Sequence, residues 1–196
     1  HIDGDDTNVA TTNGTSDTLD FTLISINDDS GDTRDVDGTG SDTTTVDAYN
    51  GIEIDLSLTS AQRIHAEYGT DTITNIENVI GSNKNDYIQG TIGSNTLSGG
   101  SGNDYVDYVD YSSLSNSLGD TEGIKVDLTI NSQQDTKKAG LDTLKGIENI
   151  IGSSYNDTII GTSADNVILA GNGNDTIVTN GSSASGYDEI DGGSGD

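Results

Sequence analysis

The sequence predicts an all-β fold: two tandem short parallel β-rolls built from nine-residue repeats, with flanking strands. Three observations predict this fold class. Residues 81–107 consist of three nine-residue units laid end to end, and residues 72–80 form a fourth unit before them. The last unit, 99–107, has the full pattern GGxGxDxUx, in which U is a large apolar residue. All four units recur 71 positions later, as the spacing between Glu77 and Glu148 shows.

Each unit combines a glycine-rich half with a D-x-U triplet. Glycine can turn the backbone with positive φ, and the triplet can form a short strand. Two units therefore make one 18-residue coil, whose apolar side chains fill a thin interior. The sixth positions are Glu77, Asp86, Asn95 and Asp104, then Glu148, Asp157, Asn166 and Asp175. The eighth positions are Val79, Ile88, Leu97 and Val106, then Ile150, Ile159, Ile168 and Ile177.

The remaining elements follow in chain order. Alternating apolar residues predict strands at 19–24, 51–58 and 123–130. The polar stretches that follow the second and third of these strands differ most between the two copies, and we expect them to be loops. We divide the chain into an acidic strand and loop region (1–46), a first module (47–113, roll at about 72–107), a second module (114–180, roll at about 143–178) and the start of a further repeat (181–196). The sequence starts at His1 and stops within a glycine-rich motif, so we expect a segment of a longer protein.

The composition favours a fold that depends on metal ions. Only 30% of the residues are hydrophobic, and 34 acidic residues against seven Lys and Arg give a net charge of -27. Such a chain repels itself when it compacts and has little apolar surface to offset the ordering entropy. The carboxylates, however, are placed periodically. Multivalent cations bound to them would remove the repulsion and contribute folding free energy.

Calcium is the cation that these residues fit, since it takes six to eight oxygen ligands from carboxylates and carbonyls. Residues 18 apart stack on the same edge of a roll, so Asp86 pairs with Asp104, and Asp157 pairs with Asp175. We expect several Ca²⁺ ions, with one strong site per module between the paired aspartates. The alternative is that these aspartates only cap turns through Asx hydrogen bonds.

The other edge carries a Glu and an Asn in each module, and we expect it to bind calcium more weakly or to be held by hydrogen bonds. Backbone carbonyls of the turns would complete the sites. The candidate ligands are Asp86, Asp104, Asp157, Asp175, Glu77, Asn95, Glu148 and Asn166, with the turn residues Gly81, Asn83, Gly99, Gly100, Gly102, Gly152, Ser154, Gly171 and Gly173.

The GGxGxDxUx units and the stretch GIENIIGSSYNDTIIG at 146–161 resemble the repeat-in-toxin (RTX) family, whose members are exported through type I secretion systems. The resemblance covers residues 69–107 and 140–178, with Asn in place of Asp at Asn95 and Asn166. It implies a roll that is disordered inside the cell at low calcium and folds outside the cell. An extracellular location also suits a chain without Cys.

No motif in the sequence points to catalysis. HExxH, GxSxG and Cys are absent, and His65 lies in a variable polar stretch. Residues 35–40 resemble the front half of an EF-hand loop, but Val46 stands where the final Glu belongs, which favours a solvated acidic loop. The negative charge excludes nucleic acid as a partner, and no apolar run is long enough to insert in a membrane.

These observations predict a non-catalytic calcium-binding module that folds on export, within a large secreted bacterial adhesin or surface-layer protein. One alternative is an accessory domain of a secreted protease, lipase or epimerase. Another is a module that binds carbohydrate or a cell surface through the stretches 59–68 and 131–139. The expected partners are calcium, and beyond it a cell-surface glycan or neighbouring modules of the same chain.

Overall fold

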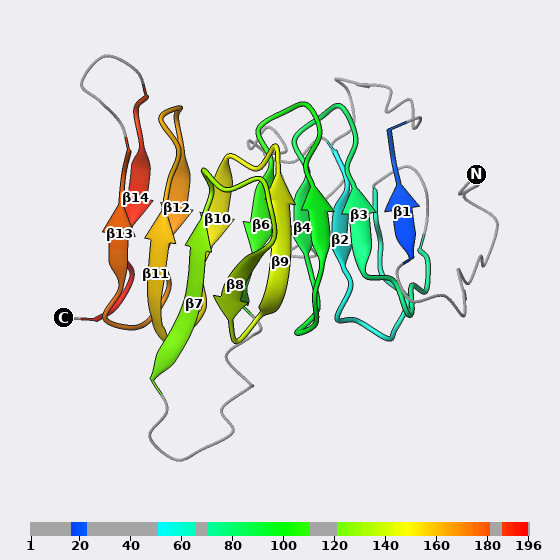
Figure 1. Cartoon of the computed structure of the whole chain (residues 1–196). Coiled ribbons are helices and arrows are strands. Elements are labelled where there is room, and N and C mark those ends of the chain that lie inside the picture. Colours follow the sequence, from blue (N-terminus) through cyan, green and yellow to red (C-terminus); the bar gives the residue numbers. More distant parts are fainter. Residues whose placement is uncertain (1–16, 23–50, 66–69, 110–120, 181–185, 196) are drawn as a thin grey trace, which may run out of the picture.

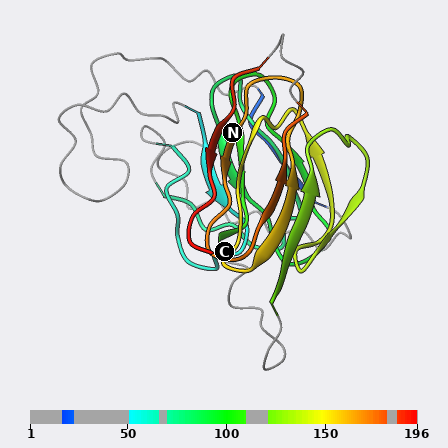
Figure 2. The same cartoon turned by 90° about the vertical axis from the view of Figure 1, so that its left-hand side faces the viewer.

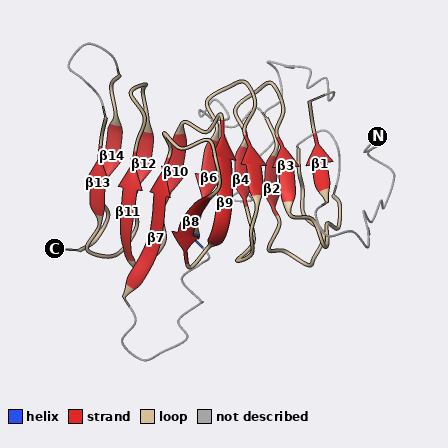
Figure 3. Ribbon diagram, viewed as in Figure 1, coloured by secondary structure: helices blue, strands red, loops and turns tan. Residues whose placement is uncertain are grey.

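The computed structural model describes residues 17–22, 51–65, 70–109, 121–180 and 186–195. In this part of the chain, short strands alternate with turns and build two sheets that face each other (Figures 1 and 2). Figure 3 shows the strands stacked side by side along the length of the molecule. Within the described ranges, we find no helix with the length and apolar character needed to cross a membrane.

The two sheets contain eight and six strands. Apart from the contacts of β8, every strand pair in them is parallel, which confirms the predicted fold class. In spatial order, the eight-stranded sheet is β1 (Thr18–Asp20), β3 (Asn78–Ile80), β5 (Thr96–Ser98), β9 (Gly140–Lys145), β8 (Gln134–Lys137), β7 (Glu122–Asp127), β11 (Asn156–Ile160) and β13 (Thr176–Val178). The six-stranded sheet is β14 (Glu189–Asp191), β12 (Val167–Leu169), β10 (Asn149–Ile151), β6 (Tyr105–Asp107), β4 (Tyr87–Gln89) and β2 (Glu53–Asp55).

The eighth-position side chains of the repeats form the interior between the sheets. Seven of the eight are 0% exposed, because each lies in register with its counterpart in the next coil: Val79, Ile88, Leu97, Val106, Ile150, Ile159 and Ile168. Burying an aliphatic side chain of this size contributes about 1.5–3 kcal/mol. The eighth, Ile177, is only partly buried because β13 is the last strand of its sheet.

The two rolls stack on each other as one continuous roll. Strand β6 of the first module pairs with β10 of the second, with Val106 opposite Ile150. In the other sheet, β5 pairs with β9, with Leu97 opposite Leu144. The apolar interior therefore continues without a break from one module into the next.

The second module is turned by half a coil relative to the first. Strands β2, β4 and β6 lie in the six-stranded sheet, whereas their counterparts β7, β11 and β13 lie in the eight-stranded sheet. Likewise, β3 and β5 lie in the eight-stranded sheet and their counterparts β10 and β12 in the other. Equivalent residues of the two modules consequently face opposite sides of the molecule.

The flanking strands are shorter than predicted because an Asp ends each of them. Asp55 Oδ1 accepts the backbone N–H of Ser57 at 2.7 Å, and Asp127 Oδ1 accepts that of Thr129 at 2.9 Å. Such Asx turns close the strands after three and six residues. The strand predicted at 19–24 is β1, which ends at Asp20.

The stretch predicted as a loop at 131–139 contains a strand, β8, which pairs antiparallel with β7 and β9. A glutamine holds it in place: Gln134 Oε1 accepts the backbone N–H of Asp127 at 2.8 Å, and its Nε2 donates to the carbonyl of Asp127 at 3.0 Å. Gln62 makes the same two bonds to Asp55 in the first module. The EF-hand-like stretch 35–40 lies outside the described residues.

Candidate functional site

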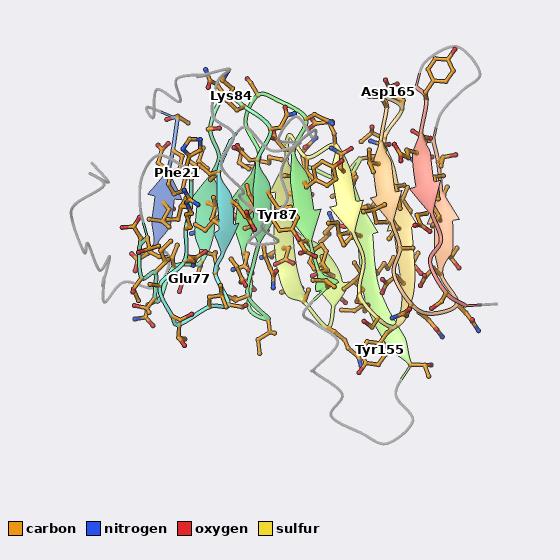
Figure 4. All side chains as sticks on the ribbon, turned by 180° about the vertical axis from the view of Figure 1, so that it is seen from behind. Phe21, Glu77, Lys84, Tyr87, Tyr155 and Asp165 are labelled. Atoms are coloured by element: carbon orange, nitrogen blue, oxygen red, sulfur yellow. The ribbon has the colours of Figure 1, made fainter. Side chains whose placement is uncertain are left out.

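The turns of the roll gather at two edges. Turns that lead into the six-stranded sheet form the upper edge in Figure 1, and turns that lead into the eight-stranded sheet form the lower edge. Figure 4 shows Lys84 and Asp165 at the upper edge and Glu77 and Tyr155 at the lower edge. Every sixth-position residue lies on one of these two edges.

Along the upper edge, each sixth-position residue is hydrogen-bonded to the sixth-position residue of a neighbouring coil. The backbone N–H of Asp86 donates to Asp104 Oδ1 at 2.8 Å, and that of Asp104 donates to Glu148 Oε2 at 2.9 Å. Asn166 Nδ2 donates to the carbonyl of Glu148 at 2.6 Å, and its N–H to Asp188 Oδ1 at 3.1 Å. The structure thus brings the predicted pair Asp86 and Asp104 together and places Glu148 directly after them.

The lower edge follows the same rule. The N–H of Asp157 donates to Asp175 Oδ1 at 2.8 Å, and Asn95 Nδ2 donates to the carbonyl of Glu77 at 2.9 Å. Asn95 N–H donates to Asp142 Oδ1 at 3.0 Å. Sequence reasoning did not single out Asp142 as a site residue, although Asp142-Thr-Leu144 is itself a D-x-U triplet.

Six of the eight sixth-position residues are Asp or Asn, and the other two are Glu. In four of these six, a donor of the same turn binds the side-chain oxygen. Ser82 donates its N–H to Asp86 Oδ2 at 2.6 Å and its hydroxyl to Oδ1 at 2.7 Å. Ser153 does the same for Asp157. Thr91 and Thr162 donate their N–H groups to the amide oxygens of Asn95 and Asn166. We call these four the capped turns.

The turns of Asp104 and Asp175 have no such donor, and we call them the open turns. At the position of Ser82 and Ser153 they carry Gly100 and Gly171. In each open turn, Oδ1 accepts one backbone N–H, while the buried Oδ2 has no hydrogen-bond partner among the residues that the structure describes. The same atom is left unpartnered in both modules.

Backbone geometry requires glycine in the open turns. Gly100 has φ of 104° and Gly171 has φ of 98°, in the left-handed region that other residues rarely adopt. A side-chain carbon on Gly100 would collide with the carbonyl oxygen of Ser82, and one on Gly171 with that of Ser153. The capped turn therefore directs a carbonyl oxygen at the open turn stacked on it.

The electrostatics of the open turn in the first module are unfavourable without a cation. Burial, aided by the nearby carboxylates of Asp86 and Glu148, raises the pKa of Asp104 to about 7, although the hydrogen bond from the Asp86 N–H lowers it. Burial also raises the pKa of Asp86 and of Asp157, although the hydrogen bonds from Ser82 and Ser153 oppose that shift. A buried acceptor without a partner costs about 1–3 kcal/mol, and more when it is charged.

A calcium ion fits this donor set. The open turns provide a buried carboxylate oxygen without a partner, and the stacked turns place carbonyl oxygens close by, which are both ligands that calcium accepts. Among the residues that the structure describes, no three His, Cys, Asp or Glu side chains converge as a metal site would require. Backbone carbonyls would therefore have to supply most of the ligands.

The other sequence candidates take their places in the same turns. Gly81, Asn83 and Gly99 belong to upper-edge turns, and Gly152, Ser154 and Gly173 belong to lower-edge turns; their roles as ligands stay predictions.

Comparison with known families gives a match that coincides with the two rolls. Residues 78–108 and 139–181 match the model of the RTX calcium-binding nonapeptide repeat (4 copies). No curated protein matches the chain.

Proposed function

We propose that the two rolls, which match the model of the RTX calcium-binding nonapeptide repeat, form a non-catalytic module that folds when calcium binds after export. RTX repeats are structural calcium-binding modules of secreted proteins. The observation that carries the proposal is the buried Oδ2 of Asp104 and of Asp175, which no group in the described part of the chain satisfies.

Calcium would act on the free energy of folding in two ways. It would provide Asp104 and Asp175 with the partner that each turn lacks, and it would reduce the self-repulsion of a chain with a net charge of -27. A ligand that binds only the folded state, at 100 times its Kd, stabilises that state by about 2.7 kcal/mol. Several ions would together shift a marginal fold from unfolded to folded.

We propose that Asp104 and Asp175 are the principal carboxylate ligands, with carbonyl oxygens of the capped turns stacked against them. Asp86 and Asp157 already accept hydrogen bonds at both oxygens, so their main role would be to shape the turns that present those carbonyls. Asn95 and Asn166 would hold the stack through their amide hydrogen bonds.

Far-UV circular dichroism during a calcium titration of chelator-treated protein tests the proposal, with magnesium as the control ion. The expected result is a cooperative change from coil to β-structure near the millimolar calcium of extracellular fluid, and no such change with magnesium, which demands a smaller octahedral site. A spectrum that is already rich in β-structure without calcium would contradict calcium-triggered folding.

We further propose that the module serves as a stiff spacer in an adhesin or surface-layer protein. The support is the continuous stack, in which the apolar interior runs through both modules. Sequencing the parent gene on both sides of this segment tests this context. Further β-roll or adhesive modules are expected there, whereas a neighbouring zinc-protease or lipase motif would assign the segment to a hydrolase.

A further inference from the structure

The contact between the two modules on the upper edge includes a pair of acidic residues beside the amide of Asn149. Asp104 belongs to the last coil of the first roll, and Glu148 to the first coil of the second. They are 44 positions apart in the sequence, yet the N–H of Asp104 donates to Glu148 Oε2 at 2.9 Å. Each carboxylate therefore stands next to a carboxylate of the other module.

The Asp104 side chain is 0% exposed, and its Oδ2 has no hydrogen-bond partner within the described ranges. The surroundings of Gly99 show which way this oxygen points. A side-chain carbon on Gly99 would collide both with Asp104 Oδ2 and with the carbonyl oxygen of Gly146. The unpartnered oxygen thus lies on the side of the turn where the second module brings its backbone closest.

Gly146 is held in the left-handed region, with φ of 54°, two residues before Glu148. Its carbonyl and the Glu148 carboxylate therefore come from one short turn of the second module. The upper edge therefore brings three groups together where the modules meet: the carboxylate of Asp104 from the first module, and the Glu148 carboxylate and the Gly146 carbonyl from the second.

A similar contact between an aspartate and a glutamate occurs where the first roll begins. The N–H of Asp17 donates to Glu77 Oε2 at 2.8 Å, and Asp17 Oδ2 is also buried without a partner in the described part of the chain. By contrast, Asp86 stacks against an Asp within one module and has both oxygens bound. In both places, an aspartate whose N–H is bound by a glutamate keeps one oxygen without a partner among the described residues, as Asp175 also does in its glycine-containing turn.

We propose that a calcium ion binds at the junction of the modules, to Asp104 Oδ2 of the first module and to the Gly146 carbonyl and the Glu148 carboxylate of the second. This junction site rests on the proposed calcium-dependent function and goes beyond it, because it joins turns that are not consecutive in the sequence. A site within one module stabilises that module alone, whereas the junction site stabilises the docking of one module on the other.

Calcium titration calorimetry on the full 196-residue chain tests the junction site, with Glu148→Gln as the variant. Glutamine keeps an oxygen that can accept the Asp104 N–H but removes the charge. Glu189→Gln is the matched control, because Glu189 is exposed on β14 and lies on the strand rather than in a turn. We expect Glu148→Gln to bind one calcium fewer, or to bind one at least tenfold more weakly, and the control to bind like wild type.

Scanning calorimetry at saturating calcium gives a second readout. The wild-type chain is expected to unfold in one transition, and Glu148→Gln in two, because its modules are no longer joined by the ion. Equal calcium stoichiometry and affinity in wild type and Glu148→Gln would overturn the junction site and leave the proposed function standing. A wild-type chain that binds no calcium would overturn both.

Glu148→Asp keeps the proposal testable if the glutamine variant does not fold. Aspartate retains the charge, so the junction site predicts that calcium restores folding to this variant more readily than to Glu148→Gln. Equal loss of folding in both variants at every calcium concentration would mean that Glu148 acts through its shape and hydrogen bond alone, and the proposal would fall.

Discussion

At the scale of the residue, the second position of each repeat decides what the sixth-position side chain does. Where that position is Ser or Thr, the turn satisfies its own Asp or Asn, as Ser82 does for Asp86. Where it is glycine, the turn adopts positive φ and leaves a carboxylate oxygen buried without a partner, as Gly100 does for Asp104. Two chemically similar turns therefore differ in whether a cation is needed to complete them.

This difference predicts opposite effects for two similar substitutions. Asp104→Asn should remove a calcium ligand and lower the calcium stoichiometry, because no described residue binds the Oδ2 of Asp104. Asp86→Asn should keep the stoichiometry and lower the melting temperature of the calcium-loaded protein, at a cost of about 1–3 kcal/mol for the weakened bonds to Ser82. Calorimetric titration and thermal unfolding of both variants measure the two effects; equal loss of calcium from both would contradict the assignment.

The raised pKa values predict that protons favour the calcium-free fold. Burial raises the pKa of Asp104 to about 7 and that of Asp142 to about 6, well above the ordinary range of an aspartate. The folded state then binds protons more tightly than the unfolded state, so stability is lost as pH rises from about 4 to about 7. Calcium-free protein should show more β-structure by circular dichroism at pH 5 than at pH 8.

Asp142→Asn provides the control for this pH dependence. Asp142 accepts hydrogen bonds from Asn95 N–H and the Thr136 hydroxyl, and asparagine has nearly the same shape without a titrating proton. The variant should lose part of the pH dependence near pH 6. A calcium-free chain that is equally unfolded at pH 5 and pH 8 would show that these carboxylates do not govern its folding.

At the scale of the element, a glutamine fixes the hairpin that separates the two rolls in the eight-stranded sheet. Gln134 bonds both backbone groups of Asp127, and Gln62 does the same for Asp55, although the surrounding polar stretches differ in sequence. The glutamine position is thus the part of these stretches that both modules share. It connects the flanking strand to the residues that enter the roll.

Gln134→Ala should destabilise the calcium-loaded protein by about 1–3 kcal/mol, because it leaves the half-buried N–H and carbonyl of Asp127 without their partner. Gln133→Ala is the neighbouring control, since Gln133 is exposed and makes one long bond of 3.5 Å to the Leu141 carbonyl. Thermal unfolding should separate the two variants. Similar melting temperatures for both would mean that the Gln134 bonds do not hold the hairpin.

At the scale of the whole molecule, folding is expected to produce a large compaction. For 196 residues, chain-length scaling gives a radius of gyration of about 47 Å for an unfolded chain and about 16 Å for a compact one. Small-angle X-ray scattering should show the radius fall towards the smaller value when calcium is added to chelator-treated protein. Magnesium at the same ionic strength is the control, and an equal fall with magnesium would point to charge screening instead.

The sequence was sufficient to predict the coil and its interior, because a nine-residue period fixes both the edge and the buried position of each residue. The pairing of Asp86 with Asp104 and of Asp157 with Asp175 followed from the same period. The contact of Asp104 with Glu148 could not be predicted, since it depends on how one module stacks on the other. Strand β8 was missed because its pairing depends on Gln134, a single polar residue in a stretch without periodicity.

The half-coil turn between modules has a consequence for any longer array of this repeat. If each added module continued the same turn, neighbouring modules would present opposite faces to one side of the fibre. A receptor approaching from that side would then meet the same surface only at every second module. Such an array would present two identical rows of binding surfaces on opposite sides, offset by one module, and could bind receptors on both sides at once.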